Sequence, residues 1–229
     1  MVKLVIFSDP ICPWCYIGKS RLDRALEARP NHPFEIEWHP FMLNPEMPPE
    51  GMDRRSYLET KFGGREGAVQ AYLPVAEEAE RAGLVFHLDK IARTPNTLDA
   101  HRLIHWAGLE GRQAFIAAAL FKAYFTEGRD IGDAGTLTEI AVAAGMEPEL
   151  VRRLLASDAD KDDIRARDAD ARARGVRAVP TFVIARQHVV PGAQPTELWL
   201  KIIDEIDAQG SALGEDLEDG APDVCDPGS

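Results

Sequence analysis

The chain has 229 residues, of which 45% are hydrophobic and 28% charged, and its formal net charge at pH 7 is −12. A chain of this length buries a sizeable core without disulfide or metal cross-links, and its acidic balance excludes nucleic acid as an expected partner. No run of 18 or more apolar residues is present, so we expect no membrane-spanning helix and no membrane partner.

The first 49 residues predict a strand, a helix and a second strand. Residues 2–7 (VKLVIF) form a short apolar run typical of a buried strand, and a helix is predicted from Pro13 to about Pro30. Residues 34–41 alternate apolar and polar side chains, as a strand with one buried face does. This order has the length of a parallel strand pair joined by a crossover helix.

The middle of the chain, residues 50–174, is predicted to be helical throughout, with glycines as stop signals. The predicted helices are 53–62, 65–82, 96–107, 111–126, 136–144, 147–156 and 160–174.

Strand signals return near the C-terminal end, at residues 179–184 and 187–193, and a last helix is predicted from 195 to about 208. The helical segment is therefore expected to be an insertion inside an α/β domain. Residues 210–229 are acidic and lack hydrophobic periodicity, so we expect a mobile or loosely docked tail there.

Cys12 and Cys15 form a Cys-Pro-Trp-Cys motif at the predicted start of the first helix. The free N–H groups and the positive end of the helix dipole favour the thiolate of Cys12, which is the reactive form. Cys15 lies about one turn further on the same side, so the two sulfurs can meet. The spacing predicts that Cys12 is the nucleophile and that Cys15, deeper and with a higher pKa, resolves the mixed disulfide. Pro13 and Trp14 would shape the turn and offer substrate an apolar surface.

The sequence also indicates the cellular compartment in which this cysteine pair acts. The apolar run at residues 2–7 is too short for the hydrophobic core of a secretory signal, so we expect a cytoplasmic protein. In that reducing compartment a vicinal cysteine pair is typically redox-active or metal-binding rather than structural.

A zinc site is the competing interpretation of the cysteines. His101 and His105 lie four residues apart on a predicted helix and could complete a Cys2His2 site, but they are far along the chain from the cysteines. We therefore expect no metal, and interpret the two histidines as a helix surface or as partners of nearby carboxylates. Cys225, in the acidic tail, is most simply an exposed bystander, with a role as a third redox thiol left open.

Four sequence blocks in this order resemble the thioredoxin superfamily. The resemblance is strongest to the FrnE-like oxidoreductases of the DsbA family, which are related to 2-hydroxychromene-2-carboxylate isomerases and kappa-class glutathione transferases. The blocks are DPICPWCYIGK (9–19), WHPFMLNP (38–45), NTLDAHRLIHWA (96–107) and GVRAVPTFVI (175–184).

This resemblance implies an α/β, thioredoxin-like fold with a large all-helical insertion domain. Residues 1–49 and 175–209 would form the two parts of the thioredoxin-like domain, β-α-β and β-β-α. Residues 50–174 would form the insertion, and residues 210–229 the acidic tail.

The resemblance also implies a thiol–disulfide oxidoreductase that uses only its cysteine pair. In the superfamily the proline matching Pro180 is cis and lies against the dithiol, so the backbone of Val179 can pair with an extended substrate. Val179, Pro180 and Thr181 are therefore expected to contact the substrate, together with Pro13 and Trp14. The partner would be a protein or a small thiol such as glutathione, which stays open as a co-substrate, as does a homodimer.

One alternative function shares the resemblance: a glutathione-dependent isomerase or a kappa-like glutathione transferase on the same fold. Those enzymes usually carry a serine where Cys12 stands, so the presence of both cysteines favours dithiol–disulfide exchange. A glutathione groove along residues 96–102 and 178–181 is left open for either function, with Asn96 as only a helix cap and Arg102 as only a surface charge as the alternatives. The natural substrate and the direction of the reaction are left open.

Overall fold

The protein is described by a computed structural model that covers the backbone of residues 1–218 and the side chains of residues 1–208. Four strands form a mixed sheet in the order β2-β1-β5-β6. The central strand β1 pairs parallel with β2 and antiparallel with β5, and β5 pairs antiparallel with β6. The strands are β1 (Val2–Ser8), β2 (Phe34–Pro40), β5 (Thr181–Ile184) and β6 (His188–Pro191).

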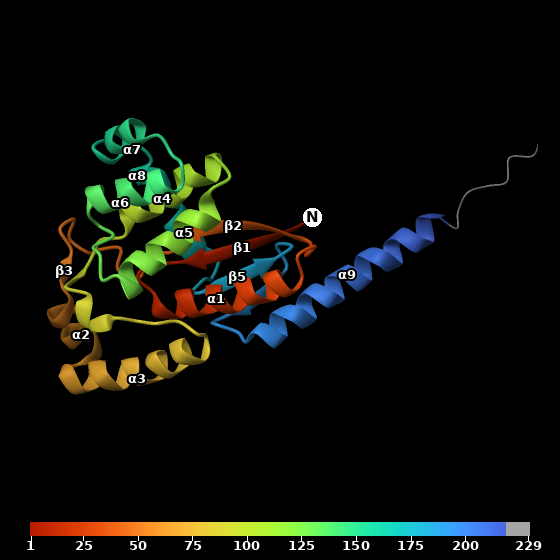
Figure 1. The fold of residues 1–229 in the computed structure, drawn as a ribbon, viewed down its shortest axis with the longest axis horizontal. Coiled ribbons are helices and arrows are strands. Elements are labelled where there is room, and N and C mark those ends of the chain that lie inside the picture. The colour runs from red at the N-terminus through yellow and green to blue at the C-terminus, as the bar shows by residue number, and fades with distance from the viewer. Residues whose placement is uncertain (219–229) are drawn as a thin grey trace, which may run out of the picture.

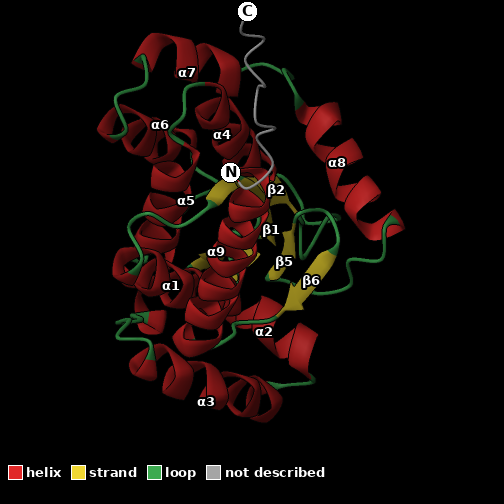
Figure 2. Ribbon diagram, turned by 90° about the vertical axis from the view of Figure 1, so that its right-hand side faces the viewer, coloured by secondary structure: helices red, strands yellow, loops and turns green. Residues whose placement is uncertain are grey.

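Helices cover both sides of this sheet (Figures 1 and 2). The crossover helix α1 (Pro13–Ala28) connects β1 to β2, which confirms the predicted β-α-β opening. On the same side lies α9 (Thr196–Glu218), whose Trp199 packs edge-on against Phe182 of β5 with ring centroids 4.8 Å apart. Figure 1 shows α4 and α5 on the opposite side, where both contact β2.

The segment between β2 and β5 is mainly helical, as predicted, and its helices lie close to their predicted bounds. It contains α2 (Arg54–Phe62), α3 (Arg65–Arg81), α4 (Leu98–Leu109), α5 (Gln113–Phe121), α6 (Ala134–Ala143), α7 (Pro148–Leu155) and α8 (Lys161–Ala173).

The prediction that this segment is helical throughout is wrong in one place. β3 (Met52–Asp53) and β4 (Arg93–Thr94) form a short antiparallel pair. Gly51, with φ of +71°, permits this pairing, because a Cβ at that position would lie 2.6 Å from the carbonyl oxygen of Thr94. Two-residue strands are too short to show a period of two, so the sequence pattern gave no sign of them.

The predicted helix 111–126 is one continuous helical run whose last turn is a π-helix. After α5 the chain continues as a π turn at Lys122–Thr126, labelled η2. The segment between α3 and β4 also holds a short 3-10 turn, η1 (Leu88–Lys90).

The predicted end of the last helix, near residue 208, is wrong. α9 runs on to Glu218, through the first part of the predicted acidic tail. Hydrophobic periodicity ends near residue 208, but the helical backbone continues through Gly210 and Gly214, since a glycine costs a helix only about 1 kcal/mol relative to alanine. The rest of the predicted tail, residues 219–229 with Cys225, lies outside the described residues. Within residues 1–218, no helix has the length and apolar character needed to cross a membrane.

Candidate active site

The Cys-Pro-Trp-Cys motif lies where β1 turns into α1. Cys12 is the N-cap residue of α1 and Pro13 is the first helical residue, which confirms the predicted helix start. The backbone N–H of Cys12 donates to the carbonyl oxygen of Asp9 at 2.9 Å. The N–H groups of Cys15 and Tyr16 donate to the carbonyl oxygen of Cys12 at 3.1 and 3.3 Å. These bonds hold the turn and place both cysteines on the first turn of the helix.

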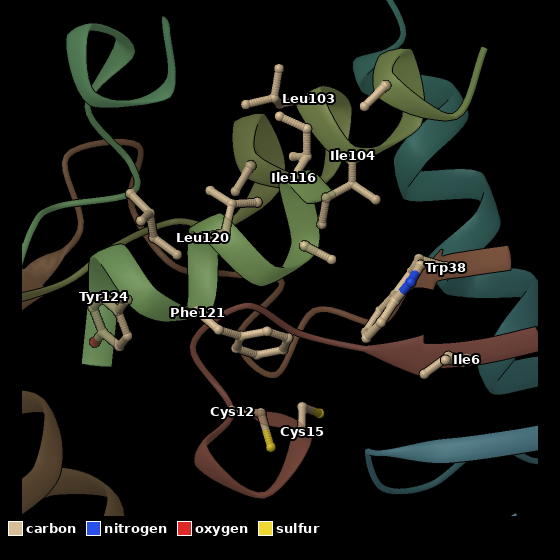
Figure 3. Packing of buried hydrophobic residues seen from close by; sticks show 14 of the residues in the cluster. Ile6, Cys12, Cys15, Trp38, Leu103, Ile104, Ile116, Leu120, Phe121 and Tyr124 are labelled. Carbon is tan, nitrogen blue, oxygen red and sulfur yellow. The ribbon is translucent and has the colours of Figure 1, made fainter. Parts of the chain in front are cut away.

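Both cysteines are free and buried, with Cys12 4% and Cys15 1% exposed. Burial and contact with the Cys12 thiol raise the pKa of Cys15 well above its usual value. The Ser8 hydroxyl and the Asp9 backbone N–H face the Cys15 sulfur and partly oppose this rise of the pKa. Cys15 is therefore the deeper cysteine, as predicted. Figure 3 shows both side chains beneath the ring of Phe121.

The turn before β5, near the C-terminal end of the chain, contacts the sulfur of Cys12. The Cys12 thiol donates to the carbonyl oxygen of Val179 with an S to O distance of 3.6 Å, and the Val179–Pro180 peptide bond is cis. Val179, Pro180 and Thr181 are all buried, whereas Pro13 and Trp14 are half-buried. The structure thus brings the predicted substrate-contact residues of this turn next to Cys12.

Gly18 allows α1 to approach this turn closely. A Cβ on Gly18 would lie 3.1 Å from Cγ of Pro180 and 3.4 Å from the ring of Phe182. Such distances are tighter than ordinary van der Waals contact, so a larger residue would push the helix and the turn apart.

Asp9 lies three residues before Cys12 and is fully buried. Its carboxylate accepts hydrogen bonds from the backbone N–H groups of Ile11 at 3.3 Å and Leu43 at 2.7 Å, and from the hydroxyl of Thr97 at 3.4 Å. Burial outweighs these bonds and raises the pKa of Asp9 to about 7. Asp9 therefore ties the active-site turn to the loop after β2 and to the start of α4.

His101 is the second buried ionisable group beneath the motif. Its Nε2 lies 3.9 Å from Oδ1 of Asp9, and the residue is 3% exposed. Burial lowers the pKa of His101 to about 4, so the ring is neutral at pH 7. The expectation of a helix surface is wrong for His101, because α4 turns this side chain toward Asp9, whereas the expectation of a carboxylate neighbour is confirmed.

An aromatic cluster adjoins the second cysteine. Tyr16 stacks between Phe121 and Phe86, with ring centroids 5.2 and 5.7 Å away, and Phe86 stacks on Phe125 at 4.9 Å. The cluster joins α1 to α5 and to the π turn that follows it.

Asn96 and Arg102, two residues of the predicted glutathione groove, form hydrogen bonds with backbone groups of the protein instead. Asn96 accepts from the N–H of Leu98 and donates to the carbonyl oxygen of Met47. Arg102 is completely buried, and its guanidinium binds one carboxylate and three carbonyl oxygens. Those partners are Asp99, Leu154, Ser157 and Ala159.

Ser8, Asp9 and His101 lie at the site but were not predicted there from the sequence. Asp9 stands three residues before Cys12, and this closeness in sequence could have marked it as a candidate. No pattern indicated that a carboxylate would be buried there. Among residues 1–208, whose side chains the structure describes, no group of three or more His, Cys, Asp or Glu is placed to hold a metal ion.

Comparisons with known proteins agree with this architecture. The model of the DSBA-like thioredoxin domain family matches residues 3–204. An uncharacterized protein of Bacillus subtilis, YwbO, is 26% identical over 205 residues, which is 89% of this chain and 96% of that protein.

Solved structures share the fold. A probable DsbA oxidoreductase of Streptomyces coelicolor is 31% identical with a TM-score of 0.79, covering 100% of this chain and 96% of that one. The cytosolic disulfide reductase DsbM of Pseudomonas aeruginosa, also solved with glutathione, is 22% identical with a TM-score of 0.66, covering 90% and 99% of the two chains. The expected α/β, thioredoxin-like fold with a helical insertion is confirmed, while the exact domain boundaries stay a prediction. This chain belongs to the DSBA-like thioredoxin domain family.

Proposed function

We propose that the protein is a thiol–disulfide oxidoreductase that uses Cys12 and Cys15 as its redox-active pair. One observation carries the proposal: two free cysteines lie on the first turn of α1, with Cys12 at the helix N-terminus and Cys15 more deeply buried. Cys12 lies at the helix N-terminus beside the turn at Val179, where a substrate disulfide would meet it before Cys15. Burial raises the pKa of Cys15, so this thiol stays protonated until the mixed disulfide on Cys12 has formed.

The reaction follows from this difference between the two thiols. The Cys12 thiolate attacks a substrate disulfide, forms a mixed disulfide and releases the first substrate thiolate. Cys15 then attacks the Cys12 sulfur, the second substrate thiolate leaves, and a Cys12–Cys15 disulfide forms. The substrate gains two electrons and the protein loses two. The same steps in reverse oxidise a substrate dithiol.

The substrate would lie across the surface formed by Pro13, Trp14 and the turn at Val179, Pro180 and Thr181. An extended segment could pair with the Val179 backbone as an added strand. Glutathione is a candidate co-substrate, supported by the glutathione-bound structure of DsbM, which shares the fold. The cytoplasmic location and a homodimer stay predictions.

Trapping tests the proposal. The Cys15→Ala variant should accumulate mixed disulfides on Cys12, because the resolving thiol is gone. The Cys12→Ser variant should reduce no insulin and form no mixed disulfide. Full activity in Cys12→Ser would exclude the proposal. Activity on an aromatic substrate that needs glutathione and survives Cys15→Ala would favour the glutathione-dependent isomerase or transferase instead.

A further inference from the structure

A pocket opens between α2, α3 and the segment that leads from η1 to β4. Figure 1 shows α2 and α3 beside each other in this part of the molecule. The volume of the pocket is about 540 Å³, and small-molecule sites typically have about 300 to 1,000 Å³. Its lining includes neither cysteine of the motif nor any residue of the turn at 179–181. The pocket is therefore a candidate site distinct from the dithiol.

The walls of this pocket are largely aliphatic. Leu58 of α2, Val69 of α3, Leu88 of η1 and Ile91 are part of its lining. The Val69 side chain is 51% exposed, so part of this apolar wall faces solvent. A ligand with an aliphatic body would remove this surface from water, which favours binding.

A buried cation lines the same pocket. Arg54, the first residue of α2, is only 6% exposed. Its guanidinium donates to the hydroxyl of Tyr124 at 2.9 Å and to the hydroxyl of Tyr72 at 3.2 Å. Among residues 1–208, no carboxylate forms an ion pair with Arg54. Such a site is unusual, because a buried charge without an opposite charge is costly.

Arg102 shows how the same chain treats another buried arginine. Its guanidinium binds the carboxylate of Asp99 and three backbone carbonyl oxygens. A guanidinium has five N–H donors, and the two phenol oxygens accept from only two of those on Arg54. Arg54 therefore keeps both an uncompensated charge and unused donors beside the pocket.

The other charged residues of the lining do not supply the missing charge. The carboxylate of Glu59 pairs with Arg55 at 2.8 Å. The carboxylate of Asp53 caps α2 by accepting from the N–H and the hydroxyl of Ser56, both at 2.9 Å. Arg65 is exposed and has no ion-pair partner among residues 1–208. Three arginines and two acidic residues thus give the lining a net charge of +1, which suits a ligand with one negative charge.

We propose that this pocket binds a small monocarboxylate with an aliphatic body. The carboxylate binds the guanidinium of Arg54, whose planar fork matches the two carboxylate oxygens. The hydrocarbon part lies against Leu58, Val69 and Leu88. This binding site does not depend on the proposed dithiol–disulfide exchange.

Titration calorimetry on the wild-type chain with three probes tests the inference. Octanoate has both the carboxylate and the aliphatic body, octanamide lacks the charge, and acetate lacks the body. We expect octanamide to bind at least about 10-fold more weakly than octanoate, because hydrogen bonds between charged groups are lost. Acetate should likewise bind at least about 10-fold more weakly. Equal affinity for octanoate and octanamide, or no binding of octanoate, overturns the inference.

Arg54→Gln removes the charge and keeps a polar side chain. We expect the affinity for octanoate to fall by at least about 10-fold and the affinity for octanamide to stay the same. Arg165→Gln, an exposed arginine on α8, is the matched control and should leave both affinities unchanged. Unchanged octanoate affinity in a folded Arg54→Gln protein overturns the inference.

Val69→Glu keeps the test decisive if Arg54→Gln does not fold. The new carboxylate lies at the edge of the pocket, at a position that is already half exposed, and competes with the ligand for Arg54. Octanoate should bind at least about 10-fold more weakly, whereas Val142→Glu, on α6 at a position 46% exposed, should bind it like wild type. Wild-type affinity in Val69→Glu overturns the inference. Cys12→Ser should bind octanoate normally, so a failure of the proposed function would leave this result unaffected.

Discussion

The sulfur of Cys12 lies 3.6 Å from the carbonyl oxygen of Val179, a residue 167 positions further along the chain. The contact joins the turn before α1 to the turn before β5, so segments from the two ends of the chain meet at Cys12. Cys12 has its sulfur at this junction, whereas Cys15 lies behind it and is only 1% exposed.

Alkylation should distinguish the two thiols. With less than one equivalent of iodoacetamide at pH 7, we expect Cys12 to be labelled at least about 10-fold faster than Cys15, because burial raises the pKa of Cys15 and keeps it protonated. Peptide mass spectrometry measures the two labels in one sample. Equal labelling of both cysteines would contradict the difference in environment on which the proposed roles depend.

Gly18→Ala should lower stability, although alanine normally favours a helix by about 1 kcal/mol over glycine. The added methyl group meets Pro180 at 3.1 Å, and overpacking costs about 1 to 3 kcal/mol. We expect a net loss of about 1 kcal/mol in urea unfolding and slower disulfide exchange. Gly108→Ala is the comparison, because its methyl group meets the amide end of the Gln113 side chain and touches neither Pro180 nor Phe182. A stabilised Gly18→Ala protein would contradict the close packing.

Asp9 should make the free energy of unfolding fall as the pH rises. Its pKa is about 7 in the folded chain against 3.8 ordinarily, so the folded state holds an extra proton between these pH values. The stability that this proton contributes is lost as the pH rises through 7, by up to about 4 kcal/mol. Urea unfolding of wild type and Asp9→Asn from about pH 4 to pH 8 should therefore show Asp9→Asn gaining relative to wild type as the pH rises.

His101, next to Asp9, changes the pH dependence of the free energy of unfolding in the opposite direction. Its pKa of about 4 lies below the ordinary 6.5, so its protonation destabilises the fold as the pH falls through this range. Repeating the Asp9→Asn series in a His101→Gln background removes this contribution. A difference between the two chains that does not change with pH would show that Asp9 keeps its ordinary pKa.

Arg102 should prove structural. Arg102→Gln loses the long fork that binds three backbone carbonyl oxygens, so we expect a loss of about 3 kcal/mol. Exposed Arg165→Gln should change stability by less than about 0.5 kcal/mol. If the folded Arg102→Gln protein is active, its KM for glutathione should equal that of wild type. A higher KM for glutathione with unchanged stability would show that Arg102 lines the predicted glutathione groove.

Local patterns were sufficient to predict most of the fold. Pro13 after Cys12 marks the start of α1, and alternation in residues 34–41 marks β2, because both signals depend on neighbouring residues alone. The β3–β4 pair and the length of α9 were not predictable in this way. The first is set by contact between distant segments, and the second by a helix that continues through two glycines.

The site was predictable only where it is contiguous. Cys12 and Cys15 follow from their spacing, whereas Asp9 and His101 come together only because the turn after β1 lies against the start of α4 in the folded chain. Polar residue types carry no hydropathy signal for burial, so the sequence could not indicate that a carboxyl and an imidazole lie together under the motif. Arg102, expected either in a groove or as a surface charge, is instead buried and binds backbone carbonyl oxygens.

The most direct test of the proposed chemistry is the mass of the intact chain after treatment with oxidised glutathione, compared among three proteins. Wild type should form a disulfide between Cys12 and Cys15 and retain no glutathione at these two positions. Cys15→Ala should carry one glutathione on Cys12, and Cys12→Ser should carry none on Cys15. Glutathione bound to Cys15 in Cys12→Ser at the same rate, with no Cys12–Cys15 disulfide in wild type, would contradict the assignment of nucleophile and resolving thiol.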